Sequence, residues 1–369
     1  GGGALLPYNR SMRFWLAALL LGTAVASRAD DAGRDLTFSG AKIVQRLEMR
    51  VGPGSAGPLW ESGPSDPVSE DFSAVALQGF MPEGDFIFEA AARSGSGWGP
   101  FASAGAERYP NGRFWVRIPI SGKKGAILRL RLTGAAAGPS AALEIFQAVL
   151  TPLRGEASAA GTDSGLAPLP VDGAVLDGVE PRSAWGARPA TGPYEPMLPL
   201  RLTLHHTEMA QPLTRADAVT ELRVIQDFHI QGRGWIDIGY HFLIDGSGRV
   251  WEGRPHSVIG AHVRNKNDGN VGIALLGNFH PPSAHRPTAA QSKAFVALAR
   301  RLVAAYSMEP RQILGHRDQQ GTSCPGDALY GRLPSLRKAV AAPAPVPALK
   351  PVMKLLQERG ADALFEGGR

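Results

Sequence analysis

The sequence holds few of the side chains that most often bind metals or act as nucleophiles, and it confines them to one stretch. It contains a single cysteine, Cys324, and no histidine before His205. All nine histidines lie between His205 and His316. One cysteine excludes an intrachain disulfide, so no disulfide framework can indicate export. Chemistry that needs imidazole or thiolate is therefore confined to the later part of the chain.

The sequence also lacks an apolar run long enough for a membrane helix. The run at residues 14–26 follows Arg13 and is too short to cross a bilayer. Small residues near its end resemble cleavage sites, so residues 1–29 are interpreted as upstream residues and a signal peptide that begins at Met12. The alternative is a buried or anchoring helix. The signal peptide predicts export to the periplasm or the cell exterior, with no transmembrane segment in the mature form.

Charge is unevenly distributed along the chain. Residues 182–338 contain 19 Lys+Arg against 12 Asp+Glu, whereas the rest is close to neutral. A basic domain on an exported chain suggests an anionic polymer as partner. No nucleic-acid partner is predicted, because no nucleic-acid motif occurs and export argues against one. The alternative is a mildly basic surface with no specific partner.

Residues 30–150 are expected to form an all-β, sandwich-like domain. The chain has 369 residues, of which 44% are apolar, so it can bury more than one core. Alternating apolar runs are separated by Gly, Pro and Ser clusters, which is typical of antiparallel strands joined by turns. Three aromatic residues could pack in the core or line a sugar-binding face: Trp98, Phe101 and Trp115. Strands are predicted at residues 72–80, 85–90, 113–119, 126–132 and 142–149.

Two segments with little periodicity flank the later domain. Residues 151–180 are rich in Ala, Gly, Pro and Ser and are predicted to be a linker. Residues 341–369 begin with a Pro-rich extended spacer and continue as a tail, in which residues 352–364 could form a short helix. The linker predicts that the two domains are joined flexibly.

Residues 181–340 alternate between strand and helix patterns, which predicts an α/β domain with a mixed central sheet flanked by helices. Helices are expected over residues 214–231 and 288–306, each opened by a capping threonine. A continuous apolar run at residues 271–276 predicts a buried central strand. Polar residues at the ends of strands are where α/β sheets hold their sites. The other strands are predicted at residues 200–205, 240–244, 249–252 and 312–316.

Three side chains form a donor set that suits Zn²⁺: His205, His316 and Cys324. Two imidazoles and one thiolate leave a fourth coordination position for water. Spacing alone leaves another interpretation open. Histidines near strand ends are often core residues, and a lone cysteine is usually a small buried hydrophobe.

Eight short motifs occur in one order and together are highly specific. They resemble the family of peptidoglycan recognition proteins and type 2 N-acetylmuramoyl-L-alanine amidases over about residues 181–340. The motifs are RSAWGAR at 182–188, LHHT at 204–207, QDFH at 226–229, GWIDIGYHF at 234–242, GAH at 260–262, VGIALLG at 271–277, GHR at 315–317 and CPG at 324–326.

The resemblance implies a zinc amidase domain that hydrolyses the amide between N-acetylmuramic acid and L-alanine in peptidoglycan. It places the Zn²⁺ ligands at His205, His316 and Cys324. It places Tyr240 beside the metal-bound water as a catalytic residue. Thr322 stands where a phage enzyme of the family has a lysine and where the animal catalytic members have a threonine. The resemblance therefore implies a second catalytic residue there, although a threonine cannot carry the positive charge of a lysine. The resemblance and the sequence together suggest three substrate contacts: His229, His262 and Asn267.

The alternative is a non-catalytic peptidoglycan receptor that uses the same groove. Family members without amidase activity typically have another residue, often serine, at the cysteine position, so Cys324 and Tyr240 favour the enzyme. The expected partners are peptidoglycan or muropeptides, the expected location is wall-associated, and a monomer is favoured. The β domain is expected to add targeting only. Wall binding is one possible role for it, and the sequence leaves open whether it binds glycan, binds protein or only packs.

Overall fold

The structure, a computed structural model, describes residues 35–39, 41–42, 45–50, 58–95, 97–136, 140–153, 173–281, 283 and 285–342. The predicted signal peptide, most of the predicted linker and nearly all of the C-terminal tail lie outside the described residues. Two parts are distinguished below: the β region, residues 35–153, and the α/β region, residues 173–342. No helix among the described residues is long and apolar enough to cross a membrane.

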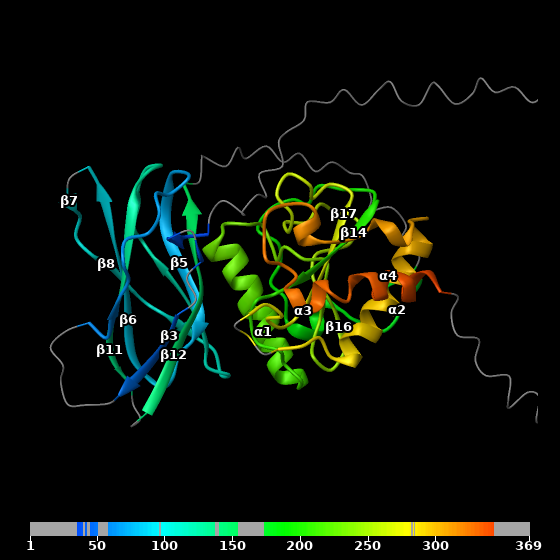
Figure 1. Cartoon of the computed structure of the whole chain (residues 1–369), viewed down its shortest axis with the longest axis horizontal. Coiled ribbons are helices and arrows are strands. Elements are labelled where there is room, and N and C mark those ends of the chain that lie inside the picture. The colour runs from blue at the N-terminus through cyan, green and yellow to red at the C-terminus, as the bar shows by residue number, and fades with distance from the viewer. Residues whose placement is uncertain are drawn as a thin grey trace, which may run out of the picture.

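The β region consists of two five-stranded sheets and a two-stranded ribbon, all paired antiparallel (Figure 1). The first sheet has the order β3 (Gln45–Arg50), β12 (Ser140–Pro152), β5 (Phe72–Phe80), β10 (Arg113–Ile118) and β9 (Glu107–Arg108). The second has the order β4 (Trp60–Glu61), β11 (Ile127–Ala136), β6 (Gly84–Ser94) and β7 (Gly97–Trp98), and β8 (Ala102–Gly105) pairs with β6. The ribbon joins β1 (Thr37–Phe38) and β2 (Ala41–Lys42).

The two sheets are held together by one apolar cluster. Leu77 and Val116 of the first sheet and Phe88 and Leu130 of the second belong to it, and each is at most 1% exposed. Alternation along the strands sends these side chains inward, because successive residues point to opposite faces. At roughly 25 cal/mol per Å² of buried apolar surface, such a cluster is the main source of stability in this region.

The α/β region is built on a six-stranded mixed sheet. Its order is β13 (Val179–Glu180), β16 (Val250–Glu252), β15 (Phe242–Ile244), β17 (Asn270–Leu275), β14 (Arg201–His206) and β18 (Ile313–Gly315). β15 and β16, which match two of the predicted strands, form an antiparallel hairpin, and the other pairs are parallel. The apolar run predicted as a central strand is β17, which lies between β15 and β14.

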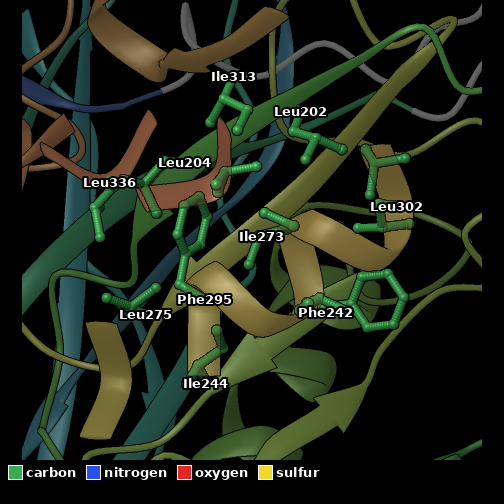
Figure 2. Close-up of a cluster of buried hydrophobic side chains, with 14 of the residues drawn as sticks. Leu202, Leu204, Phe242, Ile244, Ile273, Leu275, Phe295, Leu302, Ile313 and Leu336 are labelled. Atoms are coloured by element: carbon green, nitrogen blue, oxygen red, sulfur yellow. The ribbon is translucent and has the colours of Figure 1, made fainter. Parts of the chain in front are cut away.

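Helices cover both faces of this sheet. α2 (Ala289–Ala305) and α4 (Leu333–Ala341) pack on one face, where Phe295 and Leu302 meet Ile273 (Figure 2). α1 (Arg215–Asp227) packs on the other face through Leu222 and Ile225. The remaining helical segments are η2 (Gly173–Leu176), η3 (Arg182–Trp185), η4 (Phe228–Gly232), η5 (Pro310–Gln312), η6 (His316–Asp318) and α3 (Asp327–Tyr330).

Both predicted capping threonines start their helices. The Thr214 side chain accepts a hydrogen bond from the backbone N–H of Asp217, and Thr288 forms the full capping box with Gln291. The first helix differs from its prediction at the other end. α1 ends at Asp227, and the chain continues as a π-helical turn, η4. Single π-helical turns of this kind often mark functional sites.

The two regions contact each other directly. Arg113 of β10 forms an ion pair with Glu221 of α1 at 3.0 Å, and both side chains are at most 1% exposed. Tyr109 donates a hydrogen bond to Asp227 at 2.6 Å. An apolar cluster also joins Ala76, Trp115 and Val149 of the β region to Phe228 of η4. Figure 1 shows α1 on the side of the α/β region that faces the sheets.

These contacts change two expectations. Trp115 is 6% exposed and packs between the regions, so it does not line a sugar-binding face. Thr151, placed in the predicted linker, still belongs to β12, and its hydroxyl donates to the Gly232 carbonyl. A flexible link alone would leave the regions without direct contact, whereas the buried Arg113–Glu221 ion pair and the apolar cluster connect them directly.

Candidate metal centre and substrate cavity

Two adjacent parallel strands deliver the first two candidate ligands to one edge of the sheet. His205 lies near the end of β14, and His316 follows β18 directly. Alternation explains why His205 is available: Leu202 and Leu204 point into the apolar cluster under α2, so His205 points to the opposite face. The candidate site therefore lies at the carboxyl ends of parallel strands.

The loop before α3 brings Cys324 to the same place. Its Sγ lies 3.6 Å from His205 Nδ1, and one donor atom from each of His205, His316 and Cys324 lies within 4.8 Å of the others. In a tetrahedral site with Zn–N about 2.1 Å and Zn–S about 2.3 Å, ligand atoms lie about 3.5 Å apart. The observed donor set and its spacing fit Zn²⁺.

A chain of hydrogen bonds fixes which nitrogen of His205 is free. His262 Nε2 lies 2.9 Å from the Asn270 carbonyl, which can only accept, so this nitrogen carries the proton. His262 Nδ1 must then accept from His205 Nε2, 3.0 Å away. His205 Nδ1, the atom nearest Cys324, keeps its lone pair. Burial and the nearby His316 hold the pKa of His205 well below its usual range, so the ring stays neutral.

Tyr240 lines the same cavity as the candidate ligands, and its ring centroid lies 5.3 Å from that of His205. Burial, followed by the nearby Cys324, raises the pKa of the Tyr240 hydroxyl. The hydroxyl therefore keeps its proton at neutral pH and is a hydrogen-bond donor. Such a donor can stabilise negative charge that develops on a carbonyl oxygen in a site with little water.

Thr322 also lines the cavity, two residues before Cys324. Its Oγ1 accepts a hydrogen bond from the Cys324 backbone N–H at 3.2 Å, which helps to shape the loop that carries the thiol. The hydroxyl proton remains available for a donor role. The structure thus gives Thr322 a positioning contact, and its catalytic role stays a prediction.

The three predicted substrate contacts differ in position. His229 and His262 line the cavity, although both are at most 8% exposed. His229 Nδ1 accepts from the Gly239 N–H at 3.1 Å, so its Nε2 holds the proton. Asn267 accepts from the backbone N–H groups of His262 and Val263, both at 2.8 Å. The geometry shows positioning roles for His262 and Asn267, and substrate contact stays a prediction for all three.

The cavity has a volume of about 190 Å³ and includes residues that the sequence did not single out. Three of them come from the β region: Asp35, Gln78 and Gln147. Glu208 and Arg233 of the α/β region also line it. No motif marks the first three, because only the contact between the two regions brings them to the site. Glu208 adjoins the LHHT motif, and its position there is the one signal that could have found it.

Comparison with known proteins is consistent with this site. A sequence model described as N-acetylmuramoyl-L-alanine amidase matches residues 195–327. Peptidoglycan-recognition protein SC2 of Drosophila melanogaster is 38% identical over 154 residues, which cover 41% of this chain and 82% of that protein. N-acetylmuramoyl-L-alanine amidase of Sus scrofa is 40% identical over 161 residues, and the match spans only 26% of that relative.

Among solved structures, wild-type Drosophila PGRP-LB is 35% identical, with a TM-score of 0.40, and the match covers 42% of this chain and 92% of that one. The relationship to the SC2 protein, which extends over most of that relative's length, settles the family. The chain belongs to the family of peptidoglycan recognition proteins and N-acetylmuramoyl-L-alanine amidases.

Proposed function

We propose that the protein is a zinc-dependent N-acetylmuramoyl-L-alanine amidase, which hydrolyses the amide between N-acetylmuramic acid and L-alanine of peptidoglycan. The observation that carries this proposal is the convergence of His205, His316 and Cys324 beside a protonated Tyr240. A binding protein needs a groove but has no need for a thiolate among the metal ligands or for an oxyanion donor. The relatives named as amidases support the same conclusion.

A Zn²⁺ held by the two histidines and the cysteine would polarise the amide carbonyl and lower the pKa of a water molecule to about 7. The residues of the chain then have separate tasks. His262 holds His205 in the tautomer whose Nδ1 can bind the metal. Tyr240 donates its O–H to the carbonyl oxygen as charge develops there.

The atoms balance as for any amide hydrolysis. The water oxygen bonds to the lactyl carbonyl carbon of the muramic acid, and the C–N bond to alanine breaks. A water proton passes to the departing nitrogen, which leaves as the free amino group of the stem peptide. Thr322 stands beside Cys324 and is proposed as a second donor to the reacting oxygen.

Export, wall association and a monomeric state are part of the proposal. Export rests on residues 12–29, which have the composition of a signal peptide and lie outside the described residues. Wall association rests on the substrate, which is found in the wall. The basic balance of residues 182–338 suits an anionic wall polymer.

Mass spectrometry of peptidoglycan fragments after incubation with the full-length, zinc-loaded protein tests the function. The expected products are a free muramic acid lactyl group and a stem peptide with an N-terminal alanine. Binding of the fragments without any release of peptide would instead identify a non-catalytic receptor. The same spectra also report which diamino acid the accepted stem carries.

A further inference from the structure

A polar path runs from one part of the α/β region, through the β region, and back to the cavity. Glu221 of α1 is paired with Arg113, whose Nη2 donates to Gln78 Oε1 at 3.2 Å. Gln78 Nε2 donates to Gln147 Oε1 at 2.9 Å, and Gln147 Nε2 donates to an Asp35 oxygen at 2.7 Å. The path ends at Arg233, which lies 3.7 Å from Asp35.

The last three β-region side chains of this path, Asp35, Gln78 and Gln147, line the cavity that contains the metal ligands. Their strands explain why they are rigid. Gln78 lies near the end of β5, Gln147 pairs with it from the adjacent strand β12, and Asp35 bridges to Val149 of β12. Groups held by sheet hydrogen bonds lose little entropy when they bind a ligand, so they are suited to contact substrate.

The hydrogen-bonding capacity of these side chains indicates what they would bind. In the described part of the chain, Gln147 Nε2 donates only to Asp35, so one of its two N–H groups is left for a ligand. The Asp35 carboxylate has four acceptor positions, and it faces both Gln147 and Arg233. A donor and an acceptor side by side match an amide, which offers a C=O and an N–H.

We propose that Gln147 and Asp35 form a substrate subsite that binds an amide group of the muramoyl peptide near the scissile bond. The proposal rests on the proposed amidase function and extends it. The β region is then one wall of the active-site cavity, in contrast to the expectation that it adds targeting only. Gln78 and Arg113 are positioning residues, because Arg113 donates to Gln78 and Gln78 donates to Gln147.

Two full-length variants test the subsite with a soluble muramoyl peptide. Gln147→Leu removes the free N–H at nearly constant size, and Asp35→Asn removes the charge at constant shape. Each should raise KM by about five- to tenfold, the loss of about one hydrogen bond, with kcat changed less than twofold. Matched controls are Gln312→Leu, in η5, and Asp71→Asn, whose partner is Lys123 on the surface. Neither control should change KM.

Binding is measured separately by calorimetry in a Tyr240→Phe background, where turnover is slow. Kd for the muramoyl peptide should rise by the same factor as KM in both variants. Zinc content and the thermal midpoint report whether each variant remains folded. If Gln147→Leu destabilises the contact between the regions, Gln147→Asn serves as the second variant. Its shorter side chain keeps an amide at this position but withdraws it from the cavity, so the same rise in Kd is expected.

The outcomes separate the two proposals. Unchanged KM and Kd in folded Gln147 and Asp35 variants overturn the subsite while the amidase function stands. Tight binding by the wild-type chain without peptide release overturns the amidase function, and the Kd values of the variants still decide the subsite. A fall in kcat alone would also overturn the subsite, because it would show that these residues do not contribute to substrate binding.

Discussion

The α/β region and the β region use their polar side chains differently. In the α/β region, polar residues converge on the carboxyl ends of β14 and β18, where His205 and His316 meet Cys324. In the β region, most polar residues lie on outer faces, and Arg113 is an exception that is 0% exposed. It is buried because its partner Glu221 belongs to the other region. In the described part of the β region, the buried polar residues other than Ser65 lie where this region meets the α/β region.

This difference explains why the functional residues of the α/β region could be predicted from sequence, whereas those of the β region could not. Metal chemistry restricts which residues can act, so His205, His316 and Cys324 could be proposed as ligands from their local motifs. A docking surface has no such restriction. Asp227 and Tyr109 are 118 positions apart and form an ordinary tyrosine–carboxylate hydrogen bond. Nothing in either local sequence indicates the other.

The contrast between the two regions depends most on metal binding by the α/β region. The purified protein should contain about one zinc per chain, and Cys324→Ala should lose both the zinc and the amidase activity. Two imidazoles without a thiolate bind zinc far less tightly. Elemental analysis and the product assay measure the two effects. Ser323→Ala, at the neighbouring position, should keep the metal, and retention of full zinc by Cys324→Ala would contradict the ligand assignment.

A second test concerns the buried ion pair between the two regions, Arg113 and Glu221. Arg113→Met leaves the Glu221 carboxylate buried without its cation, which should cost about 3–5 kcal/mol of unfolding free energy. Glu221→Leu added to Arg113→Met should recover most of this loss, because an apolar pair needs no desolvation of charge. Urea denaturation of the three chains measures both effects.

A matched pair in the second sheet of the β region serves as the control. Arg131 and Glu89 form an ion pair at 2.8 Å whose side chains are 27% and 13% exposed. Arg131→Met should cost about 1 kcal/mol or less, as expected for a partly solvated pair. Equal losses for Arg113→Met and Arg131→Met would show that the buried ion pair between the regions contributes no more to stability than a partly exposed one.

Much of the α/β region could be predicted because its signals are local. Thr214 and Thr288 open their helices as predicted, since capping depends on residues three positions apart. The π-helical turn at η4 was missed because its cause is tertiary. Phe228 packs against Ala76 and Trp115, and Gly232 lies so close to Ala76 that a Cβ at this position would be 3.1 Å from the Ala76 Cβ.

The residues of the candidate site likewise fall into those that local motifs predict and those that only tertiary contacts bring together. Tyr240, His229 and His262 could be named from motifs, and the structure places all three at the cavity. Gln147 and Asp35 could not be named from the sequence. Gln147 lies in β12 and Asp35 precedes β1, and neither reaches the cavity until β5 and β12 pack against η4. The positioning role of His262 also required coordinates, since it depends on its contacts with His205 and the Asn270 carbonyl.

Within the α/β region, Tyr240→Phe distinguishes a role in the chemical step from a role in metal binding. The change removes only the O–H that is proposed to stabilise the reacting carbonyl oxygen. It should lower kcat by roughly a hundredfold, the scale of one lost oxyanion donor, while zinc content and KM remain nearly unchanged. Steady-state kinetics on a soluble muramoyl peptide measures this. A loss confined to KM would identify Tyr240 as a binding residue instead.

The smallest predicted effect concerns acid, to which the regions should respond differently because all nine histidines lie in the α/β region. His256 is 4% exposed and packs against the rings of Phe242 and Tyr306. Burial lowers the pKa of His256 from 6.5 to about 4 in the folded protein. Between these values the unfolded chain binds more protons than the folded one, so stability falls as the pH falls.

For His256 alone, this proton linkage amounts to about 1 kcal/mol of unfolding free energy between pH 7.5 and pH 5.5. His256→Leu removes the titrating group from its apolar surroundings. The wild-type protein should therefore lose about 1 kcal/mol more than His256→Leu over this interval, as measured by urea denaturation at the two pH values. Identical losses in the two chains would show that the folded and unfolded states bind protons at position 256 equally. The burial of His256 would then contribute nothing to the acid response of the α/β region.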